Sequence, residues 1–127
     1  MDHIEKWNRA ARTFDWLNMG VERRYGAHKR ALFAKAWGRV MLVAAGTGLD
    51  FSWLPPDLDI VAIDFSPEMV KRAKLRAVQY SGRLAVVEAD VEDLKFPDEY
   101  FDTVVTSCTF CSVPDPVKGL KEIRRVL

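Results

Sequence analysis

The chain has 127 residues, of which 49% are hydrophobic and 29% are charged, and its formal net charge is +1. These values are typical of one globular domain with a hydrophobic core. No apolar run reaches the roughly 18 residues that a membrane span needs, and the N-terminal stretch lacks the apolar core of a signal peptide, so we predict no transmembrane segment and expect a cytoplasmic protein.

The first 40 residues are basic, with nine Lys or Arg against four Asp or Glu. Such a segment could meet nucleic acid or an anionic membrane surface. Its bases alternate with Trp, Phe and Leu instead of forming one block, so a solvated helix surface is the favoured interpretation and nucleic-acid binding is not expected.

Apolar residues at steps of three or four predict a helix over 4–17, with Ile4 and Leu17 on its inner face, ended by Asn18 and Gly20. A second helix is predicted over 21–37, with Gly38 as its C-terminal cap. Its expected inward residues are Tyr25, Leu32, Phe33, Ala36 and Trp37. Residues 1–38 therefore form a helical N-terminal segment in this prediction.

Beyond residue 38, continuous apolar runs alternate with helical patterns. The predicted strands are 39–45, 58–64, 83–89 and 101–108. Ser66 and Pro67 start a helix that runs to about Tyr80, with Met69, Ala73, Leu75 and Val78 available for burial. A last helix follows SVPDP, with Val117, Leu120, Ile123 and Leu127 on one stripe. This alternation predicts an α/β fold, a Rossmann-like doubly wound parallel sheet over residues 39–127, truncated to about four strands. Numbered along the chain, these strands are expected in the order 3-2-1-4, with two helices before them.

Ligands of such sheets bind at the carboxyl ends of the strands. Gly46 and Gly48 let the backbone approach a ligand after the first strand, and Asp64 after the second can accept hydrogen bonds from ribose hydroxyls. Phe65 can lie against an adenine, and Asp90 can accept from its amine. The dinucleotide fingerprint fails at its third position, Leu49, so a nucleoside with a shorter tail is favoured.

Cys108 and Cys111 form a lone C-x-x-C, which could serve thiol redox chemistry or half of a zinc site. A closed zinc site needs four ligands, and neither His3 nor His28 sits at a recognisable metal-ligand spacing. We therefore predict no metal site and expect small residues that are buried or line the ligand site.

Several motifs occur in the order seen in one enzyme family: VMLVAAGTG, AIDFSPEMVKRAK, LKFPDEYFD and PDPVKGLKEIRRVL. Together they resemble class I S-adenosylmethionine (SAM)-dependent methyltransferases, in particular those acting on small molecules, lipids or quinones. The resemblance covers residues 39–127, and AARTFDWLN is similar to the family's lid helix.

The resemblance implies SAM as cofactor, with an N-terminal lid over residues 1–38 and no obligatory catalytic side chain, because the sulfonium is already activated. It implies that Ser107 lies near the transferred methyl group. The full set of implied cofactor-binding residues is Phe14, Tyr25, Ala44, Gly46, Gly48, Asp64, Phe65, Met69, Asp90, Val91 and Ser107.

Two positions depart from the family pattern. Leu42 replaces an acid that normally helps to anchor the ammonium group of SAM, and Ala44 replaces a loop glycine. The family domain also continues beyond the residues that correspond to 127. We therefore predict a methyltransferase for a small or lipid-like acceptor, with a non-catalytic SAM-binding or assembly module as the alternative. The apolar fourth strand would be a sheet edge, which predicts a homodimer whose two fourth-strand edges, or the adjoining helices, meet across a two-fold axis.

Overall fold

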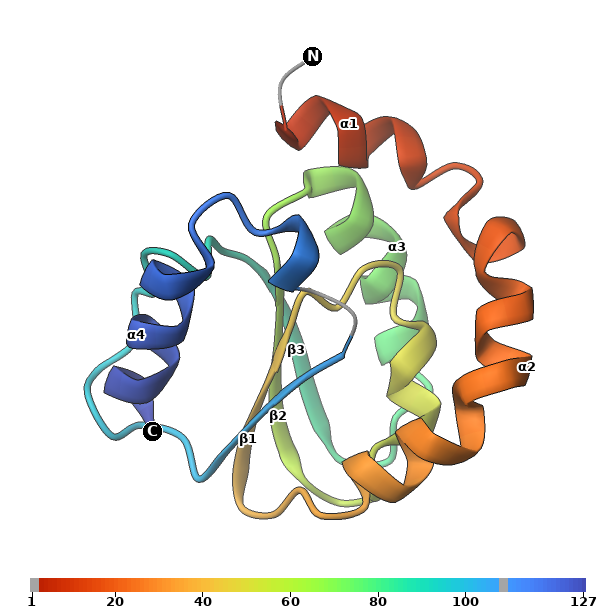
Figure 1. Cartoon of the computed structure of the whole chain (residues 1–127). Coiled ribbons are helices and arrows are strands. Elements are labelled where there is room, and N and C mark those ends of the chain that lie inside the picture. Colours follow the sequence, from red (N-terminus) through yellow and green to blue (C-terminus); the bar gives the residue numbers. More distant parts are fainter. Residues whose placement is uncertain (1–2, 108–109) are drawn as a thin grey trace.

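The computed structural model describes residues 3–107 and 110–127. Four strands form one sheet between helices, as Figure 1 shows. The elements are, in chain order, α1 (His3–Ala10), α2 (Phe14–Phe33), β1 (Arg39–Val43), the 3-10 helix η1 (Leu49–Trp53), β2 (Asp59–Asp64), α3 (Pro67–Ala77), β3 (Arg83–Glu88), β4 (Thr103–Thr106), the 3-10 helix η2 (Phe110–Ser112) and α4 (Pro116–Val126).

The sheet has the order β3-β2-β1-β4, and every pairing between neighbours is parallel. The predicted Rossmann-like fold and its strand order are therefore confirmed. The four parallel strands bring their carboxyl ends to one edge of the sheet, where the loops after β1, β2 and β3 gather.

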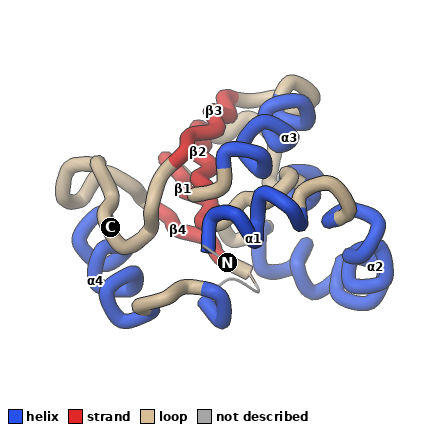
Figure 2. Tube along the Cα trace, turned by 90° about the horizontal axis from the view of Figure 1, so that it is seen from above, coloured by secondary structure: helices blue, strands red, loops and turns tan. Residues whose placement is uncertain are grey.

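Helices cover both faces of the sheet, with α2 and α3 on one side and α4 on the other (Figure 2). Alternate residues of β1 point into the two layers, as the period of a strand requires. Val40 and Leu42 join the core with Phe33 and Ala73, whereas Met41 packs on the opposite side. Both faces of β1 are thus buried, which explains its unbroken apolar sequence.

The predicted boundary between the first two helices is wrong. The chain breaks at residues 11–13, and α2 runs without interruption from Phe14 through Gly20. A Cβ at Gly20 would meet no atom within 4 Å, so this glycine needs no special conformation. Asn18 bonds back to the carbonyl of Phe14 at 2.8 Å, inside the helix. Asn18 and Gly20 therefore do not end the helix, and both are accommodated within it.

Several predicted inward residues are instead exposed, because a helical stripe gives spacing but not which side finds a partner. Phe33, Ala36, Met69 and Ala73 are buried as predicted. The exposed ones are Ile4, Leu17, Tyr25, Leu32, Trp37, Leu75, Val78, Val117, Leu120 and Leu127. The buried side of α4 is formed by Gly119 and Val126.

Gly38 is not the cap of α2, which ends five residues earlier. It has a φ of +70°, and a Cβ there would lie 2.2 Å from the carboxylate of Asp102. That carboxylate accepts a hydrogen bond from the Arg39 backbone N–H at 2.8 Å. Glycine is therefore required where the chain turns into β1.

The described part of the chain contains no helix that is both long enough and apolar enough to cross a membrane.

Candidate functional site

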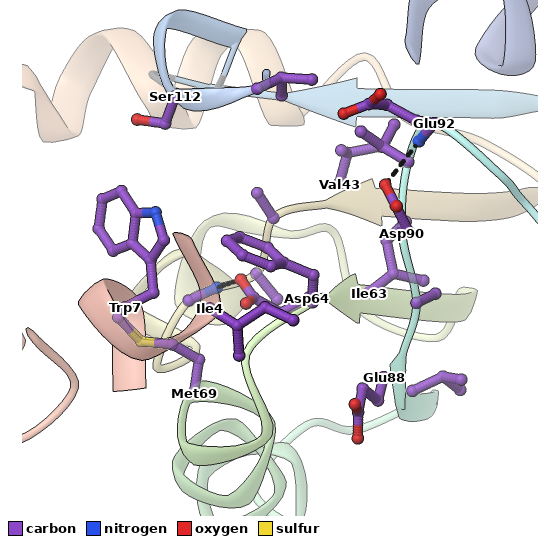
Figure 3. A pocket seen from close by; sticks show the side chains of 18 of the residues that line it. Ile4, Trp7, Val43, Ile63, Asp64, Met69, Glu88, Asp90, Glu92 and Ser112 are labelled. Atoms are coloured by element: carbon purple, nitrogen blue, oxygen red, sulfur yellow. Dashed lines mark hydrogen bonds between the residues drawn. The ribbon is translucent and has the colours of Figure 1, made fainter. Parts of the chain in front are cut away.

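A cavity of about 1080 Å³ opens at the carboxyl ends of the strands, between the loops after β1, β2 and β3 and the N-terminal helices. Its floor is built from strand ends such as Val43 and Ile63, and α1 contributes Ile4 and Trp7 from the opposite side. Figure 3 shows these side chains converging on one space. The walls therefore come from segments far apart in sequence.

Asp64 ends β2 and is only 6% exposed. One carboxylate oxygen accepts the backbone N–H of Gly46 at 2.9 Å, and the other accepts that of Ser66 at 2.9 Å. Burial raises the pKa of the Asp64 carboxyl above its ordinary value, and these backbone hydrogen bonds offset part of the rise. Asp64 thus ties the glycine loop to the start of α3, at the cavity wall.

The start of α3 follows from local sequence. The Ser66 side chain accepts a hydrogen bond from the Met69 N–H at 3.3 Å, and Pro67 occupies the first turn, as predicted. Asn8 of α1 accepts a hydrogen bond from the Ser66 hydroxyl at 2.6 Å. The cap therefore fixes Met69 in the cavity wall and also holds α1 across it.

The loop after β1 turns through two left-handed residues, Ala44 at φ +55° and Gly46 at φ +57°. Phe14 lies over the loop, so that a Cβ at Gly46 would be 3.5 Å from its ring. Ala44 is strained in this conformation, because an L-residue there brings Cβ close to its own carbonyl. Leu42 does not line the cavity but packs in the core beneath it.

The two residues predicted to meet adenine, Phe65 and Asp90, both line the cavity. Phe65 lies at the cavity wall with its ring stacked on His3, at 4.8 Å between centroids and 12° between planes. Asp90 is exposed and accepts the Glu92 N–H at 2.9 Å, which shapes the loop after β3. A flat aromatic ring in the cavity would compete with His3 for the face of Phe65.

Nine of the eleven predicted cofactor-binding residues line this cavity: Phe14, Ala44, Gly46, Asp64, Phe65, Met69, Asp90, Val91 and Ser107. Tyr25 and Gly48 do not. Tyr25 is 42% exposed on α2, beside the Arg24 guanidinium. Gly48 caps η1 at φ +86°, where a Cβ would lie 2.7 Å from the Phe51 ring. Gly48 therefore shapes the turn without reaching the cavity. Of the C-x-x-C pair, Cys108 lies outside the described residues.

An ion pair in the cavity wall was missed by sequence reasoning. Lys29 of α2 and Asp50 of η1 lie 2.9 Å apart, with side chains 11% and 18% exposed. They are 21 residues apart in sequence, so no spacing signals the pair. A charged pair that is partly removed from water is costly unless its geometry is good, and here it faces a ligand-sized space.

A second polar network joins α2 to the site. Asp15 accepts hydrogen bonds from Arg76 at 2.7 Å and from the Thr47 hydroxyl, and Arg76 also reaches the Thr47 carbonyl at 2.9 Å. Burial tends to raise the pKa of Asp15, but the hydrogen bonds from Arg76 and Thr47 outweigh it and the pKa is lowered. The loop after β1 is thereby clamped between α2 and α3.

The sequence of the chain matches a known protein family. The model of the family described as "Methyltransferase domain" matches residues 41–127. The chain is 37% identical over 118 residues to a ubiquinone/menaquinone biosynthesis C-methyltransferase of Geobacter sp. strain M21, covering 87% of this chain and 50% of that protein. It is 37% identical over 117 residues to a phosphatidylethanolamine N-methyltransferase of Cereibacter sphaeroides, covering 90% and 55%.

Among solved structures, the chain is similar to a chain in the structure of a complex. That complex joins the Haloferax volcanii Trm112 methyltransferase activator and a methyltransferase. The match has a TM-score of 0.73 and 30% identity, and it covers 95% of this chain and 55% of the other. The chain thus spans about half the length of the relatives it matches.

Proposed function

Because the chain belongs to the methyltransferase domain family, we propose that its cavity binds SAM and that the methyl group is transferred to a small or lipid-like acceptor. The single observation that carries the proposal is the meeting of Asp64, Phe65 and the Gly46 loop at one cavity. The names of the relatives, a quinone C-methyltransferase and a phosphatidylethanolamine N-methyltransferase, support the class of acceptor.

The adenosyl end fits the β2 and β3 side of the cavity. The Asp64 carboxyl stands at the cavity wall, where its oxygens can accept hydrogen bonds from ribose hydroxyls. Phe65 offers a flat ring to the adenine, and Asp90 offers an acceptor for its exocyclic amine. These are the roles that the sequence predicted, and they remain proposals.

The amino-acid end of SAM carries both an ammonium and a carboxylate. Lys29 and Asp50 offer the two opposite charges beside the glycine loop, so we assign this ion pair to the zwitterionic tail. With Leu42 in the core, the acid that the family resemblance places on the first strand has no counterpart there. Asp50 supplies a carboxylate from another element.

SAM supplies an activated methyl group, so the chain's own residues need only bind and orient the two reactants and exclude water. The N-terminal helices act as a lid in this proposal, since Trp7 and Phe14 close the side of the cavity opposite the strands. No described side chain is assigned a proton-transfer role.

Calorimetry tests the cofactor assignment directly. We expect SAM and its demethylated product, S-adenosylhomocysteine, to bind with one-to-one stoichiometry, and Asp64→Ala to abolish that binding while Asp59→Ala, at the other end of β2, leaves it unchanged. Transfer of a radiolabelled methyl group to quinol or aminophospholipid acceptors would then separate an enzyme from a binding protein. Absence of binding at millimolar ligand would refute the cofactor assignment.

A second candidate is a SAM-binding module without transferase activity. The strained Ala44 and the apolar Leu42 favour it, because both stand where the family pattern has residues suited to the cofactor. Cofactor binding without methyl transfer to any acceptor tested would support this candidate.

The proposed homodimer uses the free side of β4. Among the described residues β4 pairs only with β1, and Thr103–Thr106 is β-branched throughout, without proline. Such an edge can add a strand from a second copy across a two-fold axis. Light scattering at micromolar concentration should report twice the chain mass, and a monomer would refute the dimer.

A further inference from the structure

The first turn of α2 carries large apolar side chains on its outer side. Trp16 is 74% exposed, Leu17 is 63% exposed and Met19 is 52% exposed, and we call these three residues the α2 patch. Their neighbours Phe14 and Asn18 line the cavity from the inner side of the same turn. The helix lies at the outer edge of the molecule, on the other side of the sheet from α4 (Figures 1 and 2). Apolar side chains gathered on such a surface mark a binding face.

Basic side chains border the α2 patch. Arg12 lies just before it, Arg23 and Arg24 lie about two turns after Trp16 and Leu17, and all three arginines are exposed. Helical residues that are two turns apart share one side of the helix, which places Arg23 in line with Trp16. Arg24 is in line with Leu17 in the same way. The outer side of α2 therefore combines an apolar end with positive charge.

The acidic side chains described in α1 and α2 do not neutralise this border. They are Glu5, which is paired with Arg9 at 2.8 Å, and Asp15, which is paired with Arg76 of α3 at 2.7 Å. Over its first 40 residues the sequence has nine Lys or Arg against four Asp or Glu. The charge of the α2 border is thus complementary to an anionic partner.

An anionic membrane surface fits both properties of this face. Trp side chains favour the boundary between lipid headgroups and acyl chains, apolar side chains enter just below it, and arginines reach the lipid phosphates. Nucleic acid would engage the arginines but would leave Leu17 and Met19 without a partner. The sequence pattern favoured a solvated helix surface, and the exposure of the apolar residues between the bases changes that interpretation.

We propose that the α2 patch and its bordering arginines dock the chain on an anionic lipid surface. The partner is the layer of phospholipid headgroups, with the α2 patch inserted among them. Because Phe14 and Asn18 belong to the same helical turn, docking brings one wall of the cavity close to the membrane. The docking surface does not rest on the proposed function, although a lipid-like acceptor would be delivered along it.

Vesicle sedimentation tests the proposal on the full chain. One set of vesicles contains only phosphatidylcholine, and the other contains three parts phosphatidylcholine to one part phosphatidylglycerol. We expect the chain to sediment with the anionic vesicles and to stay in solution with the neutral ones. Raising the salt concentration should release it, because salt screens the attraction between arginines and lipid phosphates.

Two double variants separate the apolar contribution from the charge. Trp16→Ala with Leu17→Ser should lower the partition onto anionic vesicles by about tenfold or more, because two apolar side chains no longer enter the interface. Arg23→Gln with Arg24→Gln should lower it by about 30-fold at low salt. These residues do not line the cavity, so S-adenosylhomocysteine should bind the variants as it binds the parent chain. Urea unfolding verifies that both variants are folded.

Trp37→Ala is the matched control. Trp37 is 64% exposed, like Trp16, but it follows the other end of α2, just before β1. This variant should sediment with anionic vesicles as the parent chain does. An equal loss in Trp37→Ala and in the Trp16 and Leu17 variant would overturn the proposal, because it would indicate adsorption without a defined face.

Three other results would also overturn it. Absence of sedimentation with anionic vesicles would remove the docking surface. Tighter binding to single-stranded RNA than to anionic vesicles, unchanged by Trp16→Ala with Leu17→Ser, would assign the arginines to nucleic acid. A dimer in light scattering that the same double variant converts to a monomer would assign the α2 patch to a second copy of the chain.

Discussion

Replacing the Lys29–Asp50 pair by apolar side chains is the sharpest test of how the cofactor tail is held. Removing one partner alone would strand a buried charge and cost about 3–5 kcal/mol, so a single substitution would confuse binding with unfolding. The double variant Lys29→Met with Asp50→Leu avoids this, because apolar pairs of similar volume often replace buried ion pairs without loss of stability. Urea unfolding would verify that the variant is folded.

The magnitude follows from the contacts that the tail would lose. A hydrogen bond to a charged group contributes about 1.5–3 kcal/mol, which corresponds to about a 10- to 150-fold loss of affinity. S-adenosylhomocysteine carries the zwitterionic tail and should show this loss. Methylthioadenosine has the same adenosine but no amino-acid group, and its affinity should change by less than about twofold.

Calorimetry of both ligands against both proteins provides the assay. The control variant replaces an exposed ion pair of the cavity wall, Asp93→Asn with Lys95→Met, whose side chains are 64% and 83% exposed. It should leave both affinities unchanged, since exposed pairs contribute little. If the Lys29–Asp50 variant lost both ligands equally, the pair would be a scaffold joining α2 to η1, and the assignment to the tail would be refuted.

Three further predictions concern the loop after β1 and its surroundings. Ala44→Gly should stabilise the chain by up to about 1 kcal/mol in urea unfolding, because it relieves a left-handed alanine, and the neighbouring Ala45→Gly should not. Leu42→Asp should unfold the chain instead of improving SAM binding, since it places an unpaired carboxylate in the core, which circular dichroism would detect. Asp15→Asn should lower the free energy of unfolding by less than about 1 kcal/mol at neutral pH. Because the folded pKa of Asp15 is lowered, this difference from the parent chain should disappear as the pH falls through that pKa. A difference that persisted at lower pH would point to packing instead of charge.

The strands and the α3 cap were predictable because their signals are local. An apolar run such as 40–43 is typical of a strand buried on both faces of a parallel sheet, and the Ser66–Pro67 cap is specified within four residues. The parallel order then brings Gly46 and Asp64 to one edge of the sheet without further information. This is why most of the predicted cofactor residues line one cavity.

The polar contacts of the site could not be predicted, because they join residues that are far apart in sequence. Lys29 meets Asp50 across 21 residues, and Asp15 meets Arg76 across 61. The prediction of which side of each helix is buried was wrong for a related reason. In α3, Lys74 and Leu75 are neighbours in sequence and both are exposed, which the sequence pattern does not indicate. These positions depend on how α2, α3 and η1 pack together, which the local sequence pattern does not contain.

The attachment of α1 to the rest of the chain bears on its proposed role as a lid. No residue within α1 is fully buried, and its link to the cap of α3 is the hydrogen bond between Asn8 and Ser66. Water can replace hydrogen bonds of this kind at little net cost, whereas separating core strands would expose apolar surface. The Asp15–Arg76 ion pair holds the start of α2, and its two side chains are each about 40% exposed, so water can replace this contact as well. In the proposed lid role, opening α1 would break the Asn8–Ser66 hydrogen bond and the His3–Phe65 stacking, and the sheet that carries Asp64 would stay intact.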